Sequence, residues 1–125
     1  MLLNCLAVGA GGGIGAVCRY LIGLLPFLQK GALPLQTLLV NVLGALLIGM
    51  IVKSAESCPA FSSQMVLFLK VGICGGFTTF STFSLETFTL LQEGKLLTAG
   101  GYIAASVFLC LLGVFAGQWL AEHFS

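Results

Sequence analysis

Charged residues are scarce in this sequence: only 7% of the 125 residues are Asp, Glu, Lys or Arg, whereas 58% are hydrophobic. The mean hydropathy is +1.12, which lies far outside the range of a soluble domain of ordinary composition. The net charge is +1 and no basic run occurs, so the sequence suggests neither nucleic acid as a partner nor a polybasic lipid-binding patch. The composition predicts an integral membrane protein, surrounded by the lipid bilayer.

Groups that usually carry catalysis or bind metals are also few. His123 stands alone near the C-terminus, and no pair of the five cysteines has metal-ligand spacing. We interpret the cysteines as small buried hydrophobic residues. No nucleophile, base and orienting group form a constellation, so the sequence does not predict an enzyme.

Four apolar runs are long enough to span a membrane, which takes about 20 residues at about 1.5 Å rise each. They cover approximately residues 3–25, 35–52, 62–91 and 97–121 of a single membrane domain, residues 1–125. The third run is too long for one straight span. Because glycine and β-branched threonine are poor helix formers, we expect a break near residues 75–79, as in discontinuous transporter helices. The predicted fold class is therefore an all-α integral membrane protein of four transmembrane helices.

Small residues punctuate the spans, among them Gly9, Gly13, Gly44, Gly113 and Gly117. In lipid, close backbone approach through small residues is the main packing device between helices. We therefore expect these glycines to mark helix contacts. Four short spans can hardly enclose a pathway alone, so we also expect association, with a homodimer as the simplest form.

The positive charges give almost no preferred orientation. With four spans, Lys53 and Lys70 favour one side of the membrane, while Arg19, Lys30 and Lys95 favour the other. The positive-inside rule needs an excess on one side to fix the orientation. The chain is therefore expected to insert both ways.

Polar side chains within spans are costly, so each needs a partner or a function. Asn41 lies in the second span with Thr37 one turn earlier, and its amide either contacts an ion or only joins helices. On the fourth span Tyr102, Ser106 and Cys110 recur every four residues and form a stripe on one face. This stripe is consistent with the solvation of a dehydrated ion and equally with helix packing.

The stretch 71–83 places glycines, hydroxyls and phenylalanines together in an apolar run. Unwound backbone at membrane depth survives only where protein or water satisfies it, which indicates an ion site. Phe80 and Phe83 share a face beside Ser81 and Thr82. Buried core packing is the ordinary role of such rings, but ring edges carry positive potential and attract anions.

Two charged residues flank this region without a defined role. Glu86 follows the break by two to three turns, and a solvated carboxylate near an aqueous mouth is the favoured interpretation. Arg19 lies near the end of the first span. It either extends to the interface or contributes positive potential to an anion vestibule.

Three motifs occur in order along the chain. They are Gly12-Gly13-x-Gly15-Ala16-x-x-Arg19-Tyr20, Thr37-Leu38-x-Val40-Asn41-x-x-Gly44, and Gly72-x-x-Gly75-Gly76-Phe77-Thr78-Thr79-Phe80-Ser81-Thr82-Phe83. Together they resemble the Fluc (CrcB) family of microbial fluoride channels. The resemblance covers essentially the whole chain.

The resemblance implies an antiparallel, dual-topology homodimer with two fluoride pathways. It also implies a structural sodium ion at the dimer interface, held by the backbone carbonyls of Gly75 and Thr78. This agrees with the preference of a hard cation for oxygen ligands. The same resemblance places the anion pathway on Phe80, Phe83, Asn41, Ser81, Thr82, Tyr102 and Ser106. At Cys110 the family pattern leads us to expect a serine or threonine.

The resulting hypothesis is passive, fluoride-selective export from the cytoplasm through a bacterial inner membrane, which confers fluoride resistance. The alternative is a small proton-coupled exporter, either a fluoride antiporter or a multidrug type. Such an exporter needs a carboxylate embedded in the membrane, and the first two predicted spans contain no Asp or Glu. A non-transporting membrane subunit is the remaining alternative.

Overall fold

The structure, a computed structural model, describes residues 1–124, and every regular element in that range is helical. In chain order the elements are α1 (Leu2–Gly23), η1 (Pro26–Gln29), α2 (Leu35–Ser57), α3 (Ser63–Val66), η2 (Leu67–Cys74), α4 (Gly75–Phe77), α5 (Phe80–Gln92) and α6 (Leu96–Phe124). The predicted all-α fold is confirmed.

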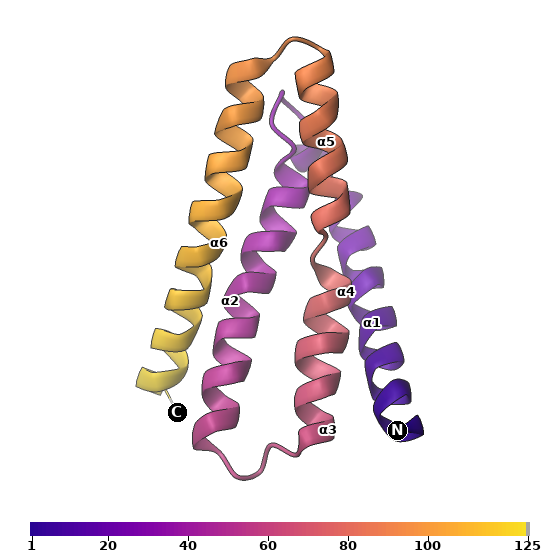
Figure 1. Cartoon of the computed structure of the whole chain (residues 1–125), viewed down its shortest axis with the longest axis vertical. Helices are drawn as coiled ribbons and strands as arrows, with labels where there is room; N and C mark the ends of the chain where they lie inside the picture. Colours follow the sequence, from indigo (N-terminus) through magenta and orange to yellow (C-terminus); the bar gives the residue numbers. More distant parts are fainter. Residues whose placement is uncertain (125) are drawn as a thin grey trace.

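Four helical segments are long and apolar enough to cross a membrane: Leu2–Gly23, Leu35–Ser57, Ser63–Gln92 and Leu96–Phe124. Both termini and the α2–α3 loop lie at one end of the molecule, and the other two connections lie at the opposite end (Figure 1). The chain is therefore a multi-pass membrane protein with the four spans that the apolar runs predicted.

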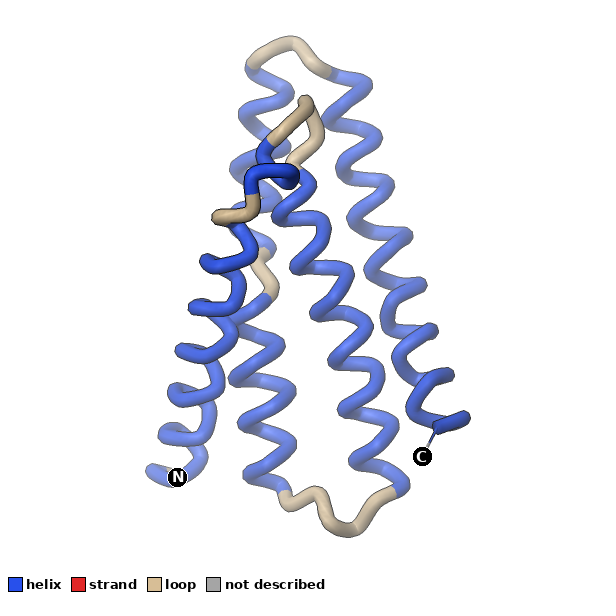
Figure 2. The backbone as a smooth tube through the Cα atoms, turned by 180° about the vertical axis from the view of Figure 1, so that it is seen from behind, coloured by secondary structure: helices blue, strands red, loops and turns tan. Residues whose placement is uncertain are grey.

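The third span is a composite of four elements. It begins with α3, where Ser62 caps the helix by accepting a hydrogen bond from the Met65 N–H at 3.1 Å. It continues as the π-helix η2 and the single turn α4, and resumes as α5 after an interruption that Figure 2 shows as a short loop. The interruption was predicted, whereas the eight-residue π-helix was not. Its hydrogen bonds run to the fifth preceding residue rather than the fourth, a difference that hydrophobic periodicity does not reveal.

The first span packs against η2 through glycines, although not through those predicted. A Cβ added at Gly11 or Gly72 would lie 2.9 Å or less from backbone atoms of the other helix, whereas Gly9 and Gly13 have no atom within 4 Å. The prediction for Gly9 and Gly13 was therefore wrong. The helix turns Gly11 and Gly15, which lie one turn apart, toward the third span instead.

Helices α2 and α6 lie side by side along most of their length (Figure 1). Gly113 and Gly117 bring the two backbones together, since a Cβ added at either would meet backbone atoms of α2. Gly44 of α2 leaves room for the methyl group of Thr78. These three glycines contact other helices as predicted, and Gly44 bears directly on the break.

The five cysteines are all free. Only Cys74 is buried within the chain, while Cys5, Cys18 and Cys58 are exposed. The interpretation of all five as buried residues was wrong, because these three lie on the outer surface of the chain.

Candidate functional site

The break in the third span is confined to Thr78 and Thr79, within the predicted region. Both residues have extended backbones, with φ −88° and ψ 161° at Thr78 and φ −152° and ψ 116° at Thr79. Thr79 then caps α5, because its Oγ1 accepts a hydrogen bond from the Thr82 N–H at 3.2 Å. The same hydroxyl donates to Thr82 Oγ1 at 3.0 Å. One β-branched residue, Thr78, thus ends a helix, and a second, Thr79, starts the next.

The Asn41 side chain supports the broken backbone. Its Oδ1 accepts a hydrogen bond from the Thr79 N–H at 2.8 Å, and its Nδ2 donates to the Thr79 carbonyl at 3.1 Å. The Asn41 amide therefore supplies partners for both the N–H and the carbonyl of Thr79, which would bond to backbone groups in a regular helix. Since an amide nitrogen carries two N–H groups, one donor remains. The two roles considered for Asn41, joining helices and contacting an ion, are thus compatible.

Several carbonyls, those of Gly75 and Thr78 among them, lose their usual donors at the break. In a regular α-helix the Gly75 carbonyl would bond the Thr79 N–H, and the Thr78 carbonyl would bond the Thr82 N–H. Both N–H groups are engaged by side chains instead, those of Asn41 and Thr79. Gly75 is exposed, with no atom within 4 Å of the place where a Cβ would stand. This donor set, carbonyl oxygens on an open face, fits a hard cation such as Na⁺.

Arg19 of α1 also contacts the region of the break. Its Nε donates to the Gly76 carbonyl at 3.1 Å, and the residue is half-buried. The guanidinium thus satisfies a third carbonyl near the break. This hydrogen bond gives Arg19 a structural role beside the two roles that the sequence left open, extension to the interface and positive potential at an anion vestibule.

A groove of about 550 Å³ is lined by the third span together with α2 and α6. Of the residues predicted for ion sites, it is lined by Asn41, Gly75, Thr78, Phe80, Phe83 and Ser106. The groove thus brings together residues that lie as much as 65 positions apart in the sequence, from Asn41 to Ser106.

The Phe80 ring is 79% exposed, and its centroid lies 5.5 Å from that of Phe83 at an interplanar angle of 47°. Phe83 in turn lies 5.0 Å from the ring of Tyr102 at 55°. Tilted pairs of this kind direct ring edges toward neighbouring faces. A continuous aromatic row therefore extends from the open groove into the core.

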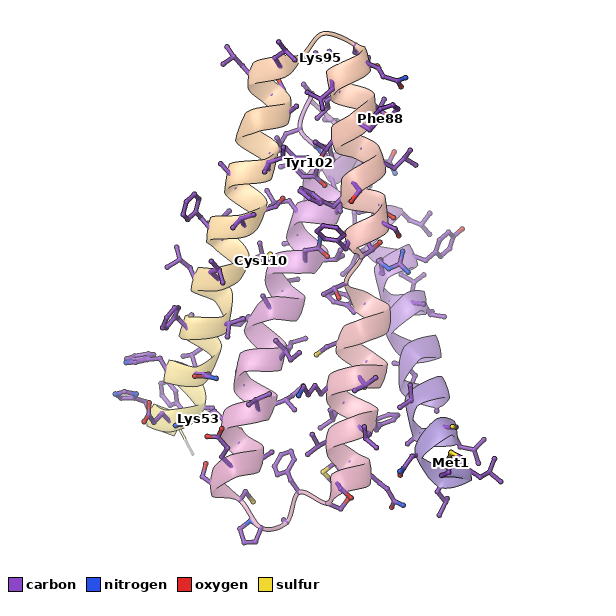
Figure 3. All side chains as sticks on the ribbon, in the orientation of Figure 1. Met1, Lys53, Phe88, Lys95, Tyr102 and Cys110 are labelled. Carbon is purple, nitrogen blue, oxygen red and sulfur yellow. The ribbon has the colours of Figure 1, made fainter. Side chains whose placement is uncertain are left out.

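Tyr102 is fully buried and donates a hydrogen bond to Glu86 Oε1 at 2.8 Å. In Figure 3 it lies between α6 and α5, and Cys110 follows farther along α6. Glu86 is half-buried, so the favoured interpretation of a simply solvated carboxylate was wrong. A phenol from the fourth span reaches it, which its position in the sequence did not reveal.

Ser106 is 7% exposed, and its Oγ has no hydrogen-bond partner among the described residues. A buried hydroxyl without a partner is costly. Because Ser106 and Cys110 both line the groove, the stripe predicted on the fourth span faces it in part. Tyr102 of the same stripe is covered by the core instead.

The sequence matches the family described as "CrcB-like protein, Camphor Resistance (CrcB)" over residues 6–118. The chain belongs to this family. "Fluoride-specific ion channel FluC" of Ruminiclostridium cellulolyticum is 44% identical over 122 residues, which cover 97% of this chain and 94% of the relative. Proteins with the same name from Geobacter sulfurreducens and Rhizobium meliloti are 48% and 47% identical. Those alignments cover 94% and 90% of this chain, and 96% and 90% of the relatives.

Not every residue assigned to the anion pathway faces the groove of this CrcB-like chain. Ser81 is exposed and Thr82 is half-buried, and neither lines the groove. Both contact the Thr79 hydroxyl, Ser81 at 3.5 Å and Thr82 at 3.0 Å. Within one subunit they therefore belong to the N-terminal cap of α5.

One contributor to the CrcB-like site was missed by sequence reasoning. Thr79 supplies the cap of α5 and the backbone that Asn41 binds, yet it was counted only as a poor helix former. Its place directly before a helical run is the usual position of an N-cap. That signal was present in the sequence.

Proposed function

We propose that this chain forms a fluoride-selective channel, which lets fluoride leave the cytoplasm passively and so confers fluoride resistance. The observation that carries this proposal is the near full-length similarity to proteins named "Fluoride-specific ion channel FluC". The bacterial sources of those relatives favour the inner membrane as its location. The names describe an ion channel rather than an enzyme.

The chemistry of the groove supports passage of a small anion. The free Asn41 N–H, the unpartnered Ser106 hydroxyl and the ring edges of Phe80 and Phe83 are neutral groups of positive potential. They can replace the water of a small anion without trapping it, because none carries a full charge. A larger halide gains less from the same donors.

The membrane potential supplies the driving force. Neutral hydrogen fluoride enters through lipid from an acidic exterior and ionises in the cytoplasm. A potential that is negative inside then expels the anion, by about 2.3 kcal/mol per elementary charge for each 100 mV. This export requires no coupled ion and no nucleotide.

We further propose that two chains associate as an antiparallel, dual-topology homodimer. The groove is open along one subunit, and the exposed Phe80 ring and the unobstructed Gly75 leave the break accessible. The small difference in charge between the two ends removes the usual barrier to opposite insertion. A second copy would cover the break from the opposite direction.

The Gly75 and Thr78 carbonyls of both copies would hold a structural Na⁺ at the centre of this dimer. Their usual donors are engaged by Asn41 and Thr79, which leaves oxygen ligands of the kind that hard cations prefer. When bound, the ion would neutralise these carbonyl dipoles and stabilise the two breaks against each other. Asn41 and Thr79 keep the ligands free by engaging the competing N–H groups.

Fluoride efflux from liposomes containing the purified protein tests the channel function. We expect rapid efflux once a potassium ionophore compensates the charge, chloride efflux at least tenfold slower, and large losses in Phe80→Ile, Phe83→Ile and Asn41→Ala. Equal rates for chloride and fluoride in the wild type would refute the proposal.

The proton-coupled alternative depends on a carboxylate that exchanges its proton with water. Glu86 is half-buried and accepts a hydrogen bond from Tyr102. Fluoride flux at clamped voltage under an imposed pH gradient separates the two mechanisms. A channel follows the fluoride gradient and the voltage alone, whereas an antiporter moves fluoride uphill when only the pH gradient is present.

A further inference from the structure

Lys70 is a charged residue within the third span that the proposed mechanism does not use. It belongs to η2 and is exposed in the single subunit. In residues 1–124 the ion pairs of lysines involve Lys53 and Lys95, and Lys70 forms none. A charge inside a membrane span is costly and is by default a functional candidate.

The position of Lys70 relates it to the groove. The third span lines the groove from Lys70 to Phe83, so Lys70 marks one limit of its length. It lies five residues before Gly75, on the π-helix that leads to the break. Lys70 is exposed, and a flexible side chain of this kind can hold its ammonium in water while its methylene groups cover apolar surface. This limit is on the side of the α2–α3 loop and the two termini (Figure 1).

A second observation indicates that the groove accepts a ligand with hydrogen-bond acceptors. Ser106 is 7% exposed and lines the same groove, and its hydroxyl has no partner in the described chain. Farther along, Asn41 retains one N–H after binding Thr79. An approaching anion therefore meets a full positive charge at Lys70 first, and neutral donors afterwards.

We propose that Lys70 is the anion-attracting charge of this groove, raising the local concentration of fluoride at the end where Lys70 lies. Narrow clefts with low-dielectric walls focus the field of such a charge and raise association rates by about 10- to 1,000-fold. Lys70 lies at the limit of the groove and not among the neutral donors. It therefore attracts the anion to the groove without forming a strong binding site inside it. The proposal rests on the fluoride channel function proposed above.

The test measures fluoride efflux from zwitterionic-lipid vesicles, and in parallel from anionic-lipid vesicles, over a range of fluoride concentrations. Each series is measured at low and at high concentration of an impermeant salt. For Lys70→Gln we expect a rate about tenfold lower at low fluoride, the smaller end of the focusing range, and a nearly unchanged rate at saturating fluoride. Lys70→Arg retains the charge and should match the wild type. The wild-type rate at low fluoride should fall with ionic strength, and that of Lys70→Gln should not.

Lys53→Gln is the matched control, because it removes the same charge at the same end of the molecule. Lys53 lies outside the groove, 3.8 Å from both Glu56 and Glu122. Its concentration dependence should equal that of the wild type.

Three results would overturn the proposal. Wild-type kinetics in Lys70→Gln would show that the charge attracts no anion. Equal losses in Lys70→Gln and Lys70→Arg at all fluoride concentrations would indicate a structural role. An effect confined to vesicles of anionic lipid would assign Lys70 to lipid phosphate. A wild type that passes no fluoride would instead refute the channel function itself.

Discussion

At the scale of single residues, Asn41 shows how a polar side chain can substitute for helical backbone. Its amide pairs with both the N–H and the carbonyl of Thr79, two groups that a break at membrane depth would otherwise leave unsatisfied. A polar residue in the second span was evident from the sequence. Its partner was not, because the two residues are 38 positions apart and only the packing of α2 against the break joins them.

Replacing Asn41 by Ala should therefore destabilise the protein beyond any effect on transport. Each buried backbone group left without a partner costs about 1–3 kcal/mol, so the apparent melting temperature in detergent should fall clearly. As a control, Ser81→Ala removes only a 3.5 Å contact at an exposed residue. Equal melting temperatures for Asn41→Ala and Ser81→Ala would contradict this role.

The Tyr102 hydroxyl is a second side chain with a defined partner. Removing it in Tyr102→Phe leaves the ring contact with Phe83 but deprives Glu86 of its donor. Hydrogen bonds to charged groups contribute about 1.5–3 kcal/mol, and we expect a destabilisation of that order by thermal unfolding in detergent. The exposed Tyr20 supplies the control, since Tyr20→Phe should change little. A melting temperature of Tyr102→Phe equal to that of Tyr20→Phe would argue against this bond.

At the scale of elements, the break could be predicted but its detailed geometry could not. Glycine and threonine propensities place the interruption near Gly75 to Thr79, and the structure has it at Thr78 and Thr79. The π-helix before it depends on how η2 contacts α1, which propensities do not encode. The contact row of α1 was also mispredicted, because closely spaced glycines offer several faces and only the packing against Gly72 selects Gly11.

The fit of α2 against the break gives a prediction at this scale. A Cβ in Gly44→Ala would meet the methyl group of Thr78, so the Thr78 side chain at the break must move. Overpacking of this kind costs about 1–3 kcal/mol, and fluoride efflux should fall together with thermal stability. Gly100→Ala is the matched control in α6, where no atom lies within 4 Å. A fully stable and active Gly44→Ala variant would mean that the break tolerates displacement.

At the scale of the whole molecule, the two ends carry similar charge, and the fold shows which loops share an end. Both termini lie with the α2–α3 loop, and the connections before α2 and before α6 lie together at the other end (Figure 1). This arrangement follows from four spans and could be predicted from the sequence. The pairing of two chains could not, because the exposed apolar surface of one subunit suits both lipid and a partner.

Dual topology can be tested by adding positive charges to the loops at one end of the molecule or to those at the other end. Ala60→Arg with Gln64→Arg adds two charges at the end that carries the termini, and Ala32→Arg with Gln92→Arg adds two at the opposite end; all four positions are exposed. By the positive-inside rule each double variant should insert in a single orientation. If the active form is an antiparallel dimer, each variant alone should lose fluoride efflux, and co-expression of the two should restore it. Accessibility labelling of the C-terminus reports the orientation independently, so full activity of either uniformly oriented variant alone would exclude the antiparallel dimer.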